Sequence, residues 1–341
     1  MPGVTRIFDL PGYMVKQFPS NRTIFSCTYD GVKYKYKSLD YVRRSNQVAA
    51  WLIQQGIKPG DTVATVLLNR PEWNFIDMGI MLAGAIHVPV YPTISESHFR
   101  FIFRDAGIKL LFIDNHNIYE RIRELIQKLE MASLPVSVER IDGLIHFTDI
   151  MNLQVSQAHL DEIAIRKRNI SETDLATIIY TSGTTGTPKG VMLTHRNIVS
   201  NFLAVSEIIR QNPVRVAASF LPLCHIYERM LNYMYQHEGI AIYYINNLDK
   251  LRDDLKIGSP EIFCAVPRFI EKMYNSIIQR GMALKRLRRA LFFWALDLAR
   301  QYDPTDRGDF WYRRRLQIAR LLVFRKWKTA MGGRLRIIVS G

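Results

Sequence analysis

Hydrophobic and polar positions along this sequence follow two alternating patterns. Short, fully apolar runs are typical of strands buried on both faces, and Thr62 to Leu68 (TVATVLL) is the clearest example. Between such runs, apolar residues recur with the spacing of an amphipathic helix, as they do from Leu39 to Gln55. Strands that alternate with helices in this way predict crossover units, and thus an α/β fold of mixed, largely parallel sheets flanked by helices.

The predicted elements cover most of the chain. We predict strands at 62–68, 85–90, 109–113, 175–180, 214–220, 240–245, 261–266 and 335–339. We predict helices at 39–55, 71–84, 96–106, 116–130, 195–211, 226–238, 248–256 and 268–280. The start of the chain and residues 133–173 follow neither pattern, so we expect irregular structure there.

The last part of the chain reads differently, as two basic amphipathic helices at 283–301 and 309–330 joined by a turn-rich link. We divide the sequence into a first α/β subdomain, 1–174, and a second, 175–341, which contains this basic helical segment, 283–330. The strand at 335–339, which we expect to be buried, runs into the last residues without the helix that normally covers such a strand. We therefore expect the sequence to be part of a longer chain.

Composition narrows the class of protein. The 341 residues are 48% hydrophobic and 23% charged, which is ordinary for a globular protein and excludes disordered, collagen-like and disulfide-stapled chains. The cysteines, Cys27, Cys224 and Cys264, are far apart and form no disulfide framework or zinc pattern, which fits a reducing cytosol. No apolar run approaches the roughly 20 residues of a membrane-spanning helix. We expect a cytoplasmic protein.

Charge is concentrated near the end of the chain. The net charge is +15, and residues 280–336 contain 16 basic and 4 acidic residues, a net of +12. The basic segment 283–330 has three interpretations: a solvated face, peripheral contact with an anionic membrane surface, or nucleic-acid binding. No recognised nucleic-acid module accompanies the charge, so we expect no nucleic-acid partner.

The loop from Tyr180 to Gly190 (YTSGTTGTPKG) is the strongest chemical signal. It lies between an apolar strand and an amphipathic helix, and it combines hydroxyl side chains, glycines and Lys189. Phosphate oxygens favour many donors and a positive charge, which these residues supply. It is not a Walker loop, since Gly190 rather than Ser or Thr follows the lysine. From the residues alone, a phosphate-binding loop and a structural turn both remain open.

Residues 181–190 resemble the signature loop of the adenylate-forming (AMP-binding) superfamily, which includes acyl-CoA synthetases, luciferases and adenylation domains of peptide synthetases. Further segments resemble motifs of long-chain fatty acid–CoA ligases; they are 70–73 (RPEW), 82–92 (LAGAIHVPVYP), 220–229 (FLPLCHIYER) and 266–274 (VPRFIEKMY). The resemblance covers nearly the whole chain. It implies the fold of the large amino-terminal domain of these enzymes, without their small carboxy-terminal domain.

The resemblance implies a two-step reaction with ATP, Mg²⁺, a long-chain fatty acid and coenzyme A. The carboxylate attacks the α-phosphorus of ATP and releases pyrophosphate, and the thiol of coenzyme A then displaces AMP from the acyl-adenylate. The implied nucleotide-binding residues are Thr181, Ser182, Gly183, Thr184, Thr185, Gly186, Lys189 and Gly190. Thr181 also helps to place the magnesium ion, and His225 lies beside the acyl carboxylate as the catalytic candidate.

Several single residues keep two interpretations. Without the motif, His225 is an ordinary capping or packing residue. Glu228 and Arg229 form either a solvated helix turn or a structural support behind His225. Arg268 is either a surface residue or lies near the acyl tunnel. We expect Tyr180 to be a packing residue, and His195 is the least ordinary of the other histidines because it follows the loop.

Family features beyond the loop are not found in these residues. They are a Tyr-Gly-x-Thr-Glu motif, a ribose-binding aspartate and a mobile carboxy-terminal domain with a catalytic lysine. We therefore expect residues 1–341 alone to bind ATP weakly and to lack adenylating activity. The alternatives are a truncated acyl- or partner-binding protein without catalysis, a fatty acyl-AMP ligase, and a ligase for aryl or short acids.

Overall fold

The computed structural model describes residues 3–128, 131, 134–181, 187–303 and 309–341. They form two compact units: unit 1 comprises Met1–Arg215 and Ser219–Asn246, and unit 2 comprises Val216–Ala218 and Asn247–Gly341. Helices flank parallel-rich sheets, so the predicted fold class is confirmed. The units do not divide the chain at residue 174, because β8 (Leu175–Thr181) pairs with β4 (Ile86–Pro89) inside unit 1. The division into subdomains 1–174 and 175–341 stays a prediction.

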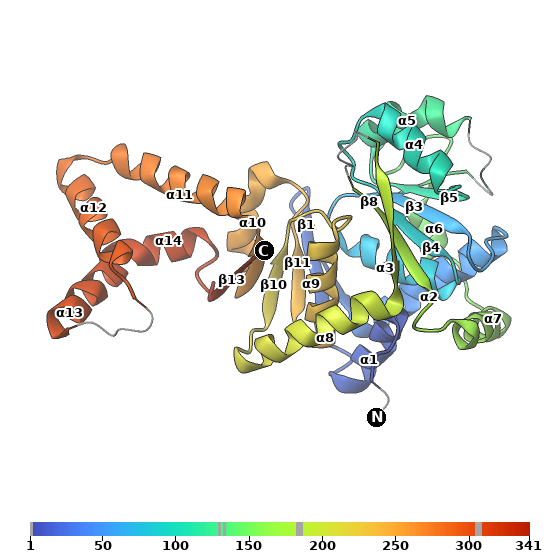
Figure 1. Cartoon of the computed structure of the whole chain (residues 1–341), viewed down its shortest axis with the longest axis horizontal. Coiled ribbons are helices and arrows are strands. Elements are labelled where there is room, and N and C mark those ends of the chain that lie inside the picture. The colour runs from blue at the N-terminus through green and yellow to red at the C-terminus, as the bar shows by residue number, and fades with distance from the viewer. Residues whose placement is uncertain (1–2, 129–130, 132–133, 182–186, 304–308) are drawn as a thin grey trace. The chain divides into compact units, whose positions relative to one another are not determined.

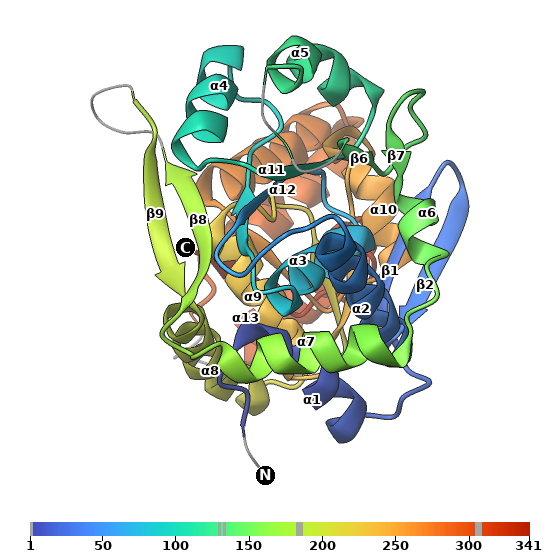
Figure 2. The same cartoon turned by 90° about the vertical axis from the view of Figure 1, so that its right-hand side faces the viewer.

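Unit 1 contains a sheet of seven strands in the order β7-β6-β5-β3-β4-β8-β9. Its other strands are β3 (Thr62–Val66), β5 (Leu110–Ile113), β6 (Val136–Ser137), β7 (Ile145–His146) and β9 (Lys189–Thr194). Neighbouring strands are parallel except β8 and β9, which form an antiparallel hairpin at one edge. Figure 2 shows this hairpin beside the strands of the sheet.

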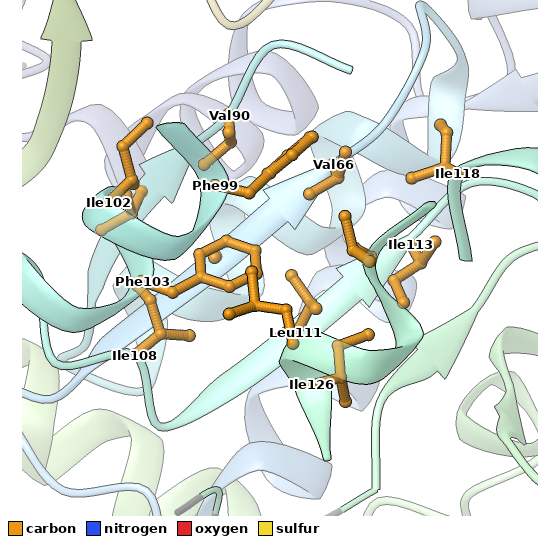
Figure 3. Close-up of a cluster of buried hydrophobic side chains, with 14 residues drawn as sticks. Val66, Val90, Phe99, Ile102, Phe103, Ile108, Leu111, Ile113, Ile118 and Ile126 are labelled. Carbon is orange, nitrogen blue, oxygen red and sulfur yellow. The ribbon is translucent and has the colours of Figure 1, made fainter. Parts of the chain in front are cut away.

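Helices cover both faces of this sheet because successive strand residues point to opposite sides. On one side, α4 (Glu96–Asp105) and α5 (His116–Ile126) pack onto alternate strand residues such as Val66 and Leu111, with Phe103 in the centre of the cluster (Figure 3). Ser95 and Asn115 cap these two helices by accepting hydrogen bonds from His98 and Ile118 backbone N–H groups.

The opposite face carries α2 (Ser38–Gln54) and α3 (Pro71–Leu82). A Cβ atom on Gly79 would lie 2.4 Å from Cβ of Val48, so the glycine allows these two helices to pack closely. Other elements of unit 1 are α1 (Leu10–Gln17), α6 (Phe147–Met151), α7 (Gln157–Asn169), α8 (His195–Gln211), α9 (Ile226–His237) and the 3-10 turn Ile7–Asp9. Three further strands, β11 (Ala241–Tyr244), β1 (Thr23–Tyr29) and β2 (Val32–Lys37), pair in that order.

Unit 2 combines three parallel strands with a group of helices, coloured orange to red in Figure 1. The strands are β10 (Val216–Ser219), β12 (Ile262–Ala265) and β13 (Ile337–Ser340). The helices are α10 (Leu251–Gly258), α11 (Pro267–Met282), α12 (Arg286–Arg300), α13 (Phe310–Ala319) and α14 (Arg325–Ala330), with a 3-10 turn at Leu248–Lys250 and a π-helical turn at Arg320–Phe324. Phe292, Leu296 and Val323 belong to a separate apolar core between these helices.

Four predictions about local structure were wrong. The start of the chain holds α1, β1 and β2, and residues 133–173 hold β6, β7, α6 and α7 rather than irregular structure. The loop 180–190 contains the start of β9. The strand β13 alternates between half-buried and exposed residues and is not fully buried. Among the described residues, no helix combines the length and the apolar character needed to cross a membrane.

Candidate functional site

The β8–β9 hairpin brings two candidate phosphate ligands together. In its register, Thr181 at the end of β8 lies opposite Lys189 at the start of β9, and both side chains are exposed. The predicted ligands Ser182, Gly183, Thr184, Thr185 and Gly186 lie outside the described residues. A hydroxyl oxygen and an ammonium group are therefore presented side by side at the head of the hairpin.

Gly190 has a packing reason to be glycine. It lies opposite Tyr180, and a Cβ atom there would come within 2.9 Å of Ile178 Cγ2 and 3.2 Å of Tyr180 Cζ. The Tyr180 hydroxyl donates a hydrogen bond to Asp105 Oδ2 at 2.5 Å, and its ring contacts Phe101 edge-on. Burial, together with Asp105, raises the pKa of Tyr180. Tyr180 is thus a packing residue, as expected, and it fastens the hairpin to α4.

His225 is the N-cap residue of α9. Its backbone N–H donates to the Pro222 carbonyl oxygen at 3.0 Å, and its ring lies 5.3 Å from that of Tyr91 between centroids. The side chain is exposed, but enough protein surrounds it for desolvation to lower the pKa of His225. The imidazole is therefore mainly neutral at pH 7.

The segment that leads to His225 is held by a residue that the sequence analysis missed. Asn69 is 5% exposed, and its amide donates to the carbonyl oxygen of Leu221 at 2.6 Å and to Ser219 Oγ at 3.2 Å. Its side-chain oxygen accepts from the backbone N–H of Leu223 at 3.2 Å. The available signal was its position directly before the motif that begins at Arg70.

Arg229 lies one helical turn behind His225 and is fully buried. Its guanidinium donates to Asp77 Oδ1 at 2.6 Å, to Thr177 Oγ1 at 2.8 Å and to the Tyr233 hydroxyl at 2.7 Å. Burial by itself raises the pKa of Asp77. The charge of Arg229 and the hydrogen bonds that the Asp77 carboxylate accepts outweigh this effect and hold the pKa below its usual range. The structure thus excludes a solvated turn here and supports the alternative, a structural role behind His225.

The same network includes His87 of β4. Its Nδ1 lies 2.6 Å from Asp77 Oδ1 and its Nε2 lies 2.8 Å from Thr65 Oγ1. Burial lowers the pKa of His87 to about 4, so the ring is neutral at pH 7. Because Asp77 can only accept, we assign the proton of the ring to Nδ1, and Nε2 then accepts from the threonine hydroxyl.

Glu228 is also buried, at 1% exposure. Neither carboxyl oxygen forms a hydrogen bond of normal geometry within the described residues, although the nearby Ser219 hydroxyl acts to lower its pKa. Burial dominates and raises the pKa of Glu228 to about 8. A neutral carboxyl group therefore lies between the first turn of α9 and the end of β10.

A cavity of about 520 Å³ adjoins the start of α9. It is lined by residues of β9, α8 and α9, namely Leu193, Asn197, Ile198, Ser200, Asn201, Ile226, Tyr227 and Met230. The lining contains apolar and neutral polar groups and no charge. Lys189 is the first residue of β9 and His225 directly precedes α9. Both candidate residues are therefore close in sequence to elements that line the cavity.

Two other candidates have simpler positions. His195 is buried at the start of α8, where Nδ1 accepts a hydrogen bond from the Ile7 N–H at 3.3 Å and the ring contacts Phe8 edge-on. Burial lowers the pKa of His195 to about 4. Arg268 is exposed in the first turn of α11 in unit 2. All three cysteines are buried free thiols.

Comparison with known proteins identifies the family. Residues 14–339 match the model of a family described as AMP-binding enzyme. The chain belongs to the AMP-binding enzyme family. The resemblance seen in the loop and the flanking motifs is thereby confirmed.

Two relatives of this AMP-binding enzyme chain are long chain acyl-CoA synthetase 7, peroxisomal, of Arabidopsis thaliana and long-chain-fatty-acid–CoA ligase 1 of Homo sapiens. Each is 30% identical, over 327 and 338 residues respectively. The alignments cover 92% of this chain and 45% of each relative, so the chain spans about half the length of the curated relatives it matches.

The fold of this AMP-binding enzyme chain is also found among solved structures. ATP-bound MatB from Rhodopseudomonas palustris superimposes with a TM-score of 0.64, covering 79% of this chain and 50% of that protein. The anthranilate CoA ligase AuaEII in complex with anthranoyl-AMP gives 0.62, covering 78% and 51%. At 22% and 19% identity, these likenesses establish the fold alone.

Proposed function

We propose that the protein containing these residues activates a long-chain fatty acid with ATP and transfers the acyl group to coenzyme A. The observation that carries this proposal is the pairing of Thr181 with Lys189 at the head of the β8–β9 hairpin, in a chain of the AMP-binding enzyme family. The kinship with long-chain acyl-CoA synthetases supports the choice of acid.

In the first step, Lys189 contributes positive charge to the β- and γ-phosphates of ATP. The Thr181 hydroxyl is a hard oxygen donor, which suits Mg²⁺, and its place opposite an exposed ammonium group suits a metal–phosphate pair. The ion, when bound, would neutralise the charge that develops on pyrophosphate. Ligation by residues 182–186 and by Gly190 is part of this proposal.

His225 contacts the acyl carboxylate in our proposal. Its neutral imidazole offers one N–H donor without an opposing charge, so it orients the carboxylate while leaving its negative charge available for attack on phosphorus. The cavity beside α9 accepts the first part of the acyl chain, since its lining is uncharged and partly apolar.

Arg229 is a positioning residue for both parts of this site. Through Thr177 it is bonded to β8, the strand that ends at Thr181, and it lies four residues after His225 on α9. Asp77 fixes the guanidinium from α3. Because all these groups are buried in unit 1, the network fixes the position of the β8–β9 hairpin relative to the start of α9.

Palmitate-dependent exchange of labelled pyrophosphate into ATP tests the proposal in the protein as it occurs. We expect exchange with palmitate and formation of palmitoyl-CoA when coenzyme A is added. Exchange without thioester formation would instead indicate a fatty acyl-AMP ligase, and exchange with benzoate or octanoate but not palmitate would refute the long-chain assignment.

We also propose that the basic segment 283–330 contacts membranes peripherally, with no role in nucleic-acid binding.

A further inference from the structure

Unit 2 contains a second cavity that the proposed reaction does not use. Its volume is about 550 Å³, and its walls come from α10, α11, α12, the π-helical turn and α14. The inner lining is apolar and includes Phe269, Met273, Ile277, Leu291, Phe292 and Trp327. It shares no residue with the hairpin, with His225 or with the cavity beside α9.

Close helix packing gives this cavity its walls. A Cβ atom on Gly281 of α11 would lie 2.2 Å from Cε1 of Phe292, so the glycine lets α11 and α12 meet at one side of the cavity. After α14, Gly332 has a φ of +92°, and a Cβ there would lie 2.4 Å from the carbonyl oxygen of Leu255. The cavity therefore follows from how the backbone is arranged, and it is larger than the gap left by a single side chain.

Four cations line the same cavity, one from each of its main helices: Arg252 of α10, Arg280 of α11, Arg288 of α12 and Lys326 of α14. All four are exposed, whereas the apolar lining is largely half-buried or buried, so the charges lie at the mouth. No carboxylate lines the cavity, and none of the four forms a salt bridge within the part of the chain that the structure describes.

We propose that this cavity binds an anionic amphiphile, with a hydrocarbon chain inside and its carboxylate or phosphate among the four cations. A hydrocarbon chain needs no hydrogen-bond partner, and apart from the cations only Ser276 and the indole N–H of Trp327 bring polar side-chain groups to the lining. A sugar or a nucleobase would leave its polar atoms unpaired there. A charge-assisted contact at the mouth requires an anion, because every charged lining residue is basic.

The amphiphile can come from two sources: it is free in solution, or it is a lipid held in a bilayer. Large apolar side chains are exposed on α12, α13 and the π-helical turn, with Leu287 at 86%, Trp311 at 68% and Leu321 at 68%. These side chains, together with the surrounding cations, fit contact with an anionic bilayer. The chemistry of the ligand is the same in both cases, so the experiment separates them.

The first measurement is displacement of fluorescent cis-parinarate from the 341-residue chain by palmitate and by hexadecanol. We expect palmitate to displace the probe roughly tenfold more effectively than the uncharged alcohol. The double variant Arg280→Glu/Arg288→Glu should weaken palmitate binding by roughly tenfold or more. The matched control, Arg313→Glu/Arg315→Glu on α13, changes the same charge outside the cavity and should leave binding unchanged.

The second measurement is flotation of the same variants with phosphatidylglycerol and phosphatidylcholine vesicles. If the cavity variant loses phosphatidylglycerol binding beyond the control but keeps palmitate affinity, the ligand is a bilayer lipid. Loss of palmitate affinity alone assigns a free amphiphile. If both assays are unchanged, or if hexadecanol matches palmitate, the proposal is overturned.

Met273→Trp provides an independent check, since the larger side chain fills the cavity from α11 without changing charge. It should also reduce palmitate binding, with the far-ultraviolet circular dichroism unchanged. ATP affinity should stay the same in all these variants, so the outcome does not depend on the proposed ligase function. Loss of palmitate binding in His225→Ala but not in the cavity variants would place the amphiphile in unit 1 and overturn the proposal.

Discussion

Two sets of cations, one in each unit of this chain, differ in whether they are paired. In unit 1 the fully buried Arg229 has three hydrogen-bond partners, including the ionised Asp77. In unit 2 the four cations that line the cavity form no salt bridge among the described residues; they are Arg252, Arg280, Arg288 and Lys326. A charge that is fully paired fixes the shape of the protein, whereas a charge without a partner remains available for a ligand. We therefore propose a structural role for the first set and a binding role for the second.

Removal of the buried cation should have the largest effect. Arg229→Met leaves Asp77 ionised and buried without its main partner, and we expect a loss of about 3–5 kcal/mol in the free energy of unfolding. Urea denaturation followed by circular dichroism measures it. The double variant Asp77→Leu/Arg229→Met should regain part of the loss, because no buried charge then remains unpaired. A loss below about 1 kcal/mol in the single variant would show that the network does not fix unit 1.

Lys189 is an exposed cation of unit 1 that we assign to ligand binding, so its loss should affect affinity and not stability. Lys189→Ala should weaken the binding of ATP with Mg²⁺ roughly tenfold through loss of a charge-assisted contact, without a change in stability. Isothermal titration calorimetry measures the affinity. Lys33→Ala, on the exposed strand β2, is the matched control and should have no effect. Equal affinity in the two variants would refute the phosphate role of Lys189.

The sequence predicted the α/β alternation of unit 1 and of the strands of unit 2 because parallel strands buried on both faces are apolar throughout, as in TVATV of β3. It failed for β2, whose residues VKYKYK are almost all exposed. It also failed for α7, where Ile163 alone is buried, so no apolar face was visible. Elements without a continuous buried face carry little periodicity for a sequence argument to use.

The candidate site was predicted only where its residues are consecutive. Thr181, Lys189 and His225 lie within motifs, but the network behind them joins Asp77, His87, Thr177 and Arg229 from four separate elements. No local pattern links positions so far apart. A signal did exist, since Asp77 interrupts a helix that is buried nearly all round and His87 lies in a buried strand. A polar residue in such a segment requires a buried partner.

Glu228 offers a smaller, pH-dependent test of charge inside unit 1. Its pKa is raised to about 8 in the folded state, against about 4.3 in an unfolded chain. The folded state therefore binds the proton more tightly, and the resulting stability is full below pH 4.3 and is lost as pH rises through 8. Glutamine has nearly the same shape as the neutral carboxyl group but does not titrate. The Glu228→Gln variant should therefore gain stability relative to the unsubstituted protein as pH rises from 5 to 8. A difference in unfolding free energy that is independent of pH would show that Glu228 is ionised when folded.

The smallest expected effect comes from the unpaired cations of α13. Arg313→Gln/Arg315→Gln removes two charges from the strongly basic segment, and neither arginine forms a salt bridge within the described part of the chain. We expect the free energy of unfolding to change by no more than about 0.5 kcal/mol, because exposed charges without partners contribute little. The sign should be a slight gain at low ionic strength, since like charges repel one another, and the gain should vanish at high salt. Thermal unfolding at both ionic strengths measures the difference. A loss above about 1 kcal/mol would mean that unit 2, like unit 1, depends on its charges for stability, and the contrast between the units would no longer hold.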